Sequence, residues 1–151
     1  AIACQMKKPV ILHTKGEEDR IASILPEYPN TYLVHWYSCE EYLDRYLALD
    51  CYFSIGPDVL WNPPVRTLAA RVPQNRILIE TDGMGAVKWA YEAPEAPKSS
   101  QLDDVRKNTN TVEEALTHTL LETAAIRQTE PSVLARQIQK NLIWGFLPAS
   151  R

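Results

Sequence analysis

Hydrophobic residues gather in four short, unbroken runs along the first half of the chain. Each run is continuous and does not alternate with polar residues, which is typical of strands that are covered on both faces of a parallel sheet. The stretches between the runs place apolar residues at helical spacing, so the pattern predicts a repeated strand and helix. The predicted strands are Pro9–His13, Thr31–His35, Cys51–Ile55 and Arg76–Thr81.

Three helices are expected between these strands. The first has Ile21 and Leu25 on one face and ends at Pro26. Ser38 and Glu41 have the spacing of a capping box, in which each side chain satisfies a backbone N–H of the other residue, and this predicts a helix start. The three expected helices are Glu17–Leu25, Ser38 to about Leu49, and about Pro64–Arg71.

The second half of the chain begins with a stretch of little periodicity, from Gly83 to Asn110, that contains several prolines and serines. This composition predicts a long loop, and loops of that length are usually functional or mobile. A second capping box, Thr111 with Glu114, predicts a helix that runs to about Arg127. A proline near its start then predicts a last helix, Glu130 to about Ile143.

Composition places the chain among ordinary globular domains, with 151 residues, 45% hydrophobic and 23% charged. Three cysteines without a C-x-x-C pair favour neither a disulfide framework nor a zinc–thiolate site. The net charge of −3 argues against tight binding of a long nucleic-acid duplex, but it leaves room for a local phosphate site. Since no run is long enough to span a bilayer and no signal-peptide core follows the first residues, we expect a cytoplasmic protein without a membrane partner.

Polar, metal-binding residue types follow three of the four predicted strands directly. His13 ends the first strand, His35 ends the second, and Asp82 follows the fourth. The carboxyl ends of parallel strands meet at one edge, where sites in α/β proteins are built. Two imidazoles and a carboxylate suit a divalent ion such as Zn²⁺, Mn²⁺ or Mg²⁺. A histidine at a strand end is more often structural when it stands alone, so the prediction depends on the three residues together.

The pattern leaves other assignments open. Repeated β/α units build either a doubly wound sheet or a barrel, and periodicity alone does not choose between them. Asp58 lies near the third strand end, but it also fits an ordinary turn. Trp36 and Tyr37 either line a substrate pocket or pack beneath the following helix. His118 lies among polar residues inside a predicted helix and is expected at the surface.

Four segments, KPVILHT, YLVHWYS, VPQNRILIETDG and NLIWGF, resemble the TatD family of metal-dependent hydrolases, within the amidohydrolase superfamily. The resemblance covers essentially all of the chain. It implies an α/β fold of the TIM-barrel type, in which residues 1–151 are the last four β/α units, the C-terminal half of one domain. The family's His-x-His pair and bridging Glu are absent from this sequence. The resemblance therefore implies association with the missing N-terminal half or with another copy of the chain.

The resemblance also implies roles for single residues. His13, His35 and Asp82 correspond to ligands of one or two divalent ions, Mg²⁺, Mn²⁺ or Zn²⁺, and Asp82 to the catalytic proton acceptor. Lys15 stands where the family usually has Arg, and it can contact a phosphate only as a point charge. Gly83 stands where the family has Ser, and Glu80 and Thr81 complete the family's E-T-D signature. Arg76 matches the basic residue that typically opens the last strand, and it is expected to be structural. Trp36, Tyr37 and the segment from Met84 to Trp89 are expected to stack on a base.

The function implied by the resemblance is metal-assisted hydrolysis of phosphodiester bonds at DNA or RNA ends, that is, a deoxyribonuclease or phosphodiesterase. Two alternatives remain. The same site could hydrolyse a small amide, lactone or ester, which the acidic charge balance and Gly83 permit. Alternatively, the chain is a non-catalytic half-barrel that acts as a binding or structural partner, because it lacks the upstream ligands.

Overall fold

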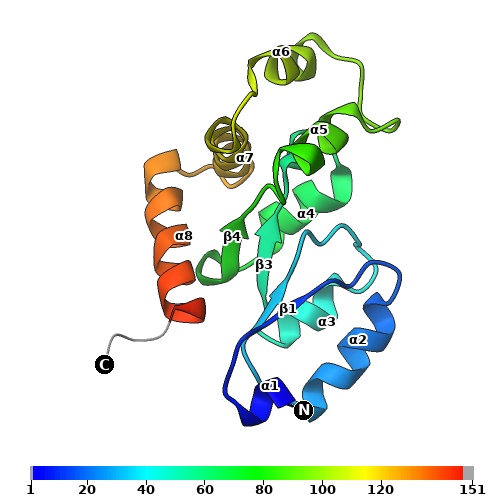
Figure 1. Ribbon diagram of the computed structural model, residues 1–151, viewed down its shortest axis with the longest axis vertical. Helices are drawn as coiled ribbons and strands as arrows, with labels where there is room; N and C mark the ends of the chain where they lie inside the picture. Colours follow the sequence, from blue (N-terminus) through cyan, green and yellow to red (C-terminus); the bar gives the residue numbers. More distant parts are fainter. Residues whose placement is uncertain (1, 148–151) are drawn as a thin grey trace.

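Four parallel strands form one sheet in chain order, as the hydrophobic runs predict (Figure 1). The structure is a computed structural model that describes residues 2–147. Each strand pairs in parallel with the next. The observed strands are shorter than the predicted runs because residues at one or both ends of each run lie outside the ladder. They are β1 (Val10–Leu12), β2 (Tyr32–Val34), β3 (Tyr52–Ile55) and β4 (Ile77–Ile79).

Helices connect the strands and continue after the last one, so the repeated strand and helix are confirmed. Within residues 2–147, no helix is both long and apolar enough to cross a membrane. Figure 1 shows α5 and α6 beyond the carboxyl ends of the strands. The helices are α1 (Ile2–Gln5), α2 (Glu18–Ile24), α3 (Leu43–Ala48), α4 (Pro63–Arg71), α5 (Met84–Glu92), α6 (Ser100–Asn108), α7 (Val112–Ile126) and α8 (Pro131–Phe146).

The two predicted capping boxes have different outcomes. The box at Thr111 forms: its hydroxyl accepts from the backbone N–H of Glu114 at 3.1 Å, and the Glu114 carboxylate accepts from the N–H of Thr111 at 3.0 Å. The box at Ser38 is wrong, because α3 begins only at Leu43 and has no side-chain cap. Tyr37 and Leu43 are both buried, so the chain between them connects two buried residues and does not form the first turns of a helix.

The prediction of a long loop from Gly83 to Asn110 is also wrong, since α5 and α6 occupy most of it. The two helices bury a small hydrophobic cluster of their own against α7. The prolines that suggested a loop lie in the connection between α5 and α6. The cluster consists of Val87, Ala90, Tyr91, Ala93, Ala96, Leu102 and Ala115.

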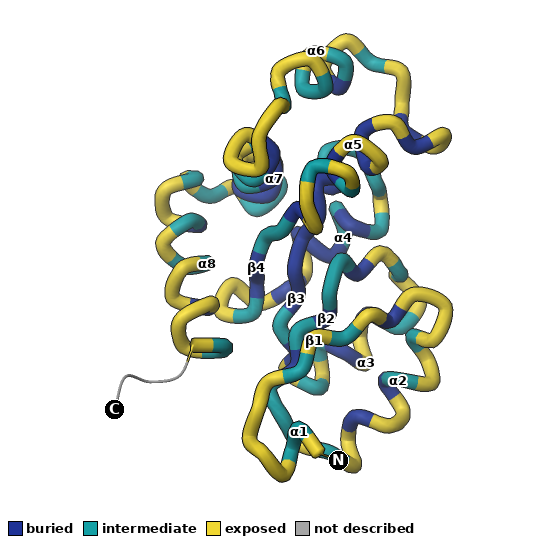
Figure 2. The backbone as a smooth tube through the Cα atoms, viewed as in Figure 1, coloured by how far each residue is buried: buried dark blue, intermediate teal, exposed yellow. Residues whose placement is uncertain are grey.

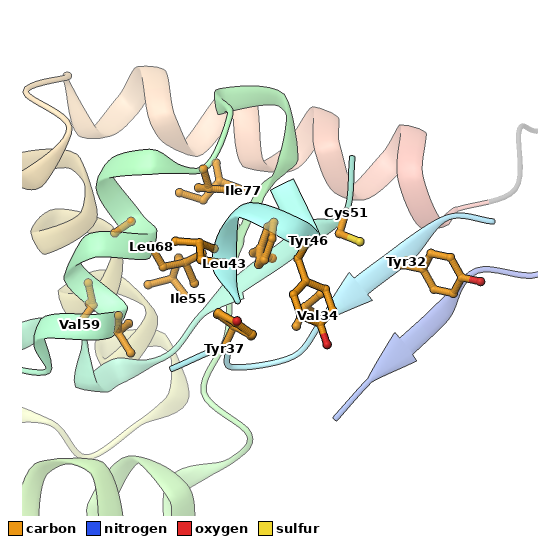
Figure 3. Close-up of a cluster of buried hydrophobic side chains, with 14 of the residues drawn as sticks. Tyr32, Val34, Tyr37, Leu43, Tyr46, Cys51, Ile55, Val59, Leu68 and Ile77 are labelled. Atoms are coloured by element: carbon orange, nitrogen blue, oxygen red, sulfur yellow. The ribbon is translucent and has the colours of Figure 1, made fainter. Parts of the chain in front are cut away.

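The main core lies between the sheet and its connecting helices, and it includes Tyr46, Ile55 and Ile77 (Figure 3). Figure 2 shows that burial is concentrated in β3 and β4 and falls toward β1. Ile11, in the middle of β1, is 61% exposed. It pairs with Leu33, and residues paired across parallel strands share one face. On the face of the sheet that carries Ile11 and Leu33, the structure therefore leaves the β1 end exposed.

Candidate active site

The carboxyl ends of the strands bring the predicted residues together. His13 and His35 directly follow β1 and β2, and their ring centroids lie 4.3 Å apart. Nε2 of His35 lies 3.7 Å from Oδ2 of Asp82, which comes three residues after the end of β4. The two imidazoles and the carboxylate thus meet at one edge of the sheet.

Glu80 holds His35 in place. Oε2 of Glu80 lies 2.7 Å from Nδ1 of His35, a distance at which a protonated ring nitrogen donates to a carboxylate. The other oxygen, Oε1, accepts from the backbone N–H of Trp36 at 3.0 Å and from the Ser54 hydroxyl. Burial raises the pKa of Glu80, and the hydrogen bond from Ser54 and the neighbouring His35 oppose that rise. His35 is therefore fixed through Nδ1, which leaves Nε2 directed toward Asp82.

Two residues at the strand ends have unusual backbone conformations. Asp82 has a φ of 52° and Trp36 a φ of 43°, both in the left-handed region. Such conformations cost about 1–3 kcal/mol in a residue other than glycine, and they concentrate at functional sites. The side chain of Asp82 is 60% exposed, so its carboxylate is accessible from solvent.

A pocket of about 740 Å³ opens beside the two histidines. Lys15 lines it, and its Nζ lies 5.7 Å from the ring centroid of Trp89 on α5. Trp36 also lines the pocket, whereas Tyr37 does not: Tyr37 is 2% exposed and packs against Tyr46 and Phe53 (Figure 3). We therefore assign Tyr37 to the hydrophobic core and not to substrate binding.

Asp58 belongs to a 3₁₀ turn, Pro57–Leu60, and it also lines the pocket. It is 3% exposed and accepts from Nε1 of Trp36 at 2.7 Å and from Nδ2 of Asn62 at 2.8 Å. Burial raises its pKa, and both hydrogen bonds oppose that rise. The two interpretations of Asp58, as a turn residue and as a residue near the site, are both correct.

The predictions for His118 and Arg76 have different outcomes. His118 is half-buried and not at the surface, because Nδ1 of its ring lies 3.0 Å from the Thr109 hydroxyl. Arg76 has the structural role expected of it: its Nε donates to the Asp50 carboxylate at 2.7 Å, and its guanidinium lies 4.8 Å from the ring centroid of Tyr52.

The donor chemistry of His13, His35 and Asp82 fits a divalent ion, since imidazole nitrogen and carboxylate oxygen are its usual protein ligands. The contact between Glu80 and Nδ1 of His35 is the type of support that orients a metal-binding histidine. Within residues 2–147, however, no three His, Cys, Asp or Glu side chains are close enough to hold an ion by themselves. The three residues therefore do not form a metal site by themselves in the part of the chain that the structure describes.

Several residues of the site were not predicted from the sequence. The supporting role of Glu80 and Ser54 had a detectable signal, because alternation along β3 and β4 places Ser54 and Glu80 on the same sheet face as His35. Trp61 had no such signal, because it reaches the pocket through a turn that strand patterns do not locate, whereas Trp89 ends the segment that the resemblance had already indicated.

The four parallel strands, with polar residues at their carboxyl ends, define an α/β protein with a candidate hydrolytic site. The family described as TatD related DNase matches residues 1–146. The chain therefore belongs to the TatD family, and the resemblance seen in the sequence is confirmed. An uncharacterized metal-dependent hydrolase from Haemophilus influenzae is 30% identical over 105 residues, which cover 67% of this chain and 40% of that protein.

Solved structures agree on the fold. A TatD homologue from Escherichia coli K12 superposes with a TM-score of 0.72 at 19% identity, over 98% of this chain and 53% of that one. A TatD family hydrolase from Entamoeba histolytica gives 0.68 at 13% identity, over 98% and 54%. An uncharacterized amidohydrolase from Saccharomyces cerevisiae gives 0.69 at 15% identity, over 96% and 56%. The chain thus spans about half the length of the proteins it resembles.

Proposed function

We propose that this chain is part of a metal-dependent phosphodiesterase that hydrolyses DNA or other nucleotide ends. The observation that carries the proposal is the arrangement of His35, which Glu80 holds through Nδ1 while Nε2 faces Asp82 beside His13. Membership of the TatD family supports a hydrolase, and the description of the matched family supports DNA as a substrate.

The proposal includes a (β/α)8 barrel to which residues 1–151 contribute the last four units, the C-terminal half. Within the described residues, β1 and β4 each have a strand neighbour on one side only, and Ile11 is 61% exposed. Open strand edges and an exposed apolar face favour association. The partner is the N-terminal half of the barrel or another copy of the chain, which would also complete the ligand set.

His13, His35 and Asp82 would hold one or two divalent ions, Mg²⁺, Mn²⁺ or Zn²⁺, together with ligands from the partner. When bound, such an ion supplies polarisation of the phosphoryl oxygen and a lowered pKa of the attacking water. Asp82 accepts a proton from that water through its carboxylate. Glu80 keeps the imidazole of His35 oriented, and Lys15 contacts the phosphate through its ammonium.

The experiment is turnover of a short single-stranded oligonucleotide by the protein at its native length, with added Mg²⁺ or Mn²⁺ and with a chelator. Metal-dependent release of nucleotides supports the proposal, and no cleavage with any metal contradicts it. One observation favours a small neutral ester, amide or lactone instead: Glu18, Asp58 and Glu95 line the pocket and disfavour a polyanion. Turnover of a lactone and ester panel without phosphodiester turnover would establish that alternative.

A further inference from the structure

We propose that Asp58 is a positioning residue of the candidate active site: by accepting from the indole of Trp36, it keeps the backbone after His35 in its left-handed conformation. The inference rests on the proposed function and deepens it, because it adds a second support of His35 to the contact from Glu80. This second support reaches the histidine through the residue that follows it in the chain.

Trp36 has a backbone conformation that a bulky residue rarely adopts. Its φ of 43° lies in the left-handed region, where the Cβ atom crowds the following carbonyl oxygen. Such a conformation persists only where the surrounding structure determines it. The contacts of Trp36 therefore decide whether the chain keeps this shape next to His35.

Two hydrogen bonds hold Trp36, one from its backbone and one from its side chain. The backbone N–H donates to Oε1 of Glu80 at 3.0 Å, and the indole Nε1 donates to Oδ1 of Asp58 at 2.7 Å. Since φ is the rotation that relates the N–H to the side chain, fixing both groups fixes φ. Without the bond to Asp58 the indole can turn, and φ can relax by turning the N–H away from Glu80.

The Glu80 carboxylate passes this constraint to His35. Its Oε1 accepts from the Trp36 N–H, while its Oε2 lies 2.7 Å from Nδ1 of the imidazole. If the Trp36 N–H turns away, Oε1 keeps only the Ser54 hydroxyl, and the carboxylate is less firmly oriented. Nε2 of His35 is then held less firmly toward Asp82.

Asp58 is itself fixed well enough to position another residue. It is buried, and Nδ2 of Asn62 donates to its Oδ2 at 2.8 Å. Asn62 is the N-cap residue of α4, a position where asparagine is favoured as a cap, yet its side chain makes no cap hydrogen bond. The amide of Asn62 thus orients Asp58 and does not cap the helix.

Contact with the substrate is the competing role, because Asp58 also lines the pocket. Each of its oxygens already accepts from the protein, from Trp36 and from Asn62. Loss of a substrate contact raises KM, whereas loss of positioning lowers kcat and weakens metal binding. The two roles therefore differ in what a substitution changes.

The test breaks the indole hydrogen bond from both sides, with Asp58→Ala and Trp36→Phe, in the protein at its native length. The first measurement is hydrogen exchange of the backbone N–H at position 36 in the metal-free protein. We expect exchange to be about 10-fold to 100-fold faster in Asp58→Ala, the factor for loss of a hydrogen bond to a charged group. Asp58→Asn keeps an oxygen acceptor for the indole and should restore most of the protection. Trp36→Phe keeps an aromatic ring and gives the same measurement if Asp58→Ala does not fold.

The second measurement is the affinity for Mn²⁺ alone, by titration calorimetry without substrate. Each single variant should bind about 10-fold more weakly, the lower end of the range for a lost partner of a metal-binding histidine. The double variant should lose no more than either single variant, because both substitutions break one interaction. Trp144→Phe removes an indole N–H at a position that is 81% exposed on α8, and it should match the wild type.

Wild-type exchange at position 36 in Asp58→Ala, or additive losses of Mn²⁺ affinity in the double variant, would overturn the assignment. Val72, whose N–H donates to the carbonyl of Leu68 at 2.9 Å in the core, reports general stability. Equal acceleration at Trp36 and Val72 would show a merely structural role and would overturn the proposal. A raised KM with unchanged exchange and Mn²⁺ affinity would also overturn it and assign Asp58 to the substrate. If both measurements behave as expected but no oligonucleotide is cleaved, the proposed function is contradicted and the positioning role is supported.

Discussion

Replacing Glu80 by alanine tests whether its contact with His35 contributes to stability, metal affinity and turnover. The substitution leaves Nδ1 of His35 and the hydroxyl of Ser54 without their acceptor, and it leaves the backbone N–H of Trp36 with the Ser54 hydroxyl alone, at 3.3 Å. An unmade buried hydrogen bond costs about 1–3 kcal/mol, and removal of a buried carboxylate offsets part of the sum. We expect Glu80→Ala to lower the free energy of unfolding by roughly 2–4 kcal/mol. We also expect metal affinity or turnover to fall by about 10-fold to 100-fold, as is typical when the partner of a metal-binding histidine is lost.

The assay pairs urea unfolding with metal titration and oligonucleotide turnover on the same samples. Glu80→Gln should give intermediate values, because one amide oxygen still accepts while the NH₂ group faces a donor. Glu27→Ala, at an exposed glutamate remote from the strand ends, is the control and should match the wild type. If Glu80→Ala binds metal and turns over substrate within about twofold of the wild type, well short of the expected 10-fold loss, the support assigned to Glu80 is refuted.

Three further predictions follow from the packing and burial of the site. Gly56→Ala places a Cβ 2.3 Å from Trp36, so we expect a loss of about 1–3 kcal/mol in unfolding free energy, measured by urea denaturation; unchanged stability would contradict the close approach. Burial raises the pKa of Asp58 above its usual 3.8, so the folded state binds more protons than the unfolded state, and this group's contribution to stability falls as pH rises through the folded pKa. Asp58→Asn should remove that slope at pH values above 3.8, and an identical slope in both proteins would show that Asp58 is not its source. Because Ile11 is 61% exposed and Trp144 81%, analytical ultracentrifugation of residues 1–151 should show self-association or capture of the N-terminal half, whereas a compact, stable monomer would count against the half-barrel.

The sequence predicted the sheet well because its signal is local. Strands buried on both faces need unbroken apolar runs, and these runs also position the polar residues that follow them. The place of His13, His35 and Asp82 after these runs therefore predicted that they lie close together, and the structure places His13 and Asp82 each beside His35.

Features that depend on tertiary packing were not predictable in the same way. The capping patterns at Ser38 and Thr111 are similar in sequence, yet only Thr111 starts a helix, because the burial of Tyr37 draws the chain after β2 into the core. The helices α5 and α6 were not predicted, because the prolines between them indicated a loop. The contacts of Asp58 with Trp36 join residues 22 positions apart, and no local pattern indicates such a contact.

The measurement that tests the central claim most directly is the turnover of Asp82→Asn at saturating Mg²⁺ or Mn²⁺. The substitution preserves size but removes the charge and basicity of the carboxylate that lies 3.7 Å from His35. Loss of a general base typically lowers a rate by about 10²-fold to 10⁴-fold, and thermal unfolding should change little. Asp104→Asn makes the same chemical change at an exposed position on α6 and should leave the rate unchanged. A rate for Asp82→Asn above about a tenth of the wild-type rate, a loss smaller than removal of a general base produces, would contradict the role of Asp82 and the site built around it.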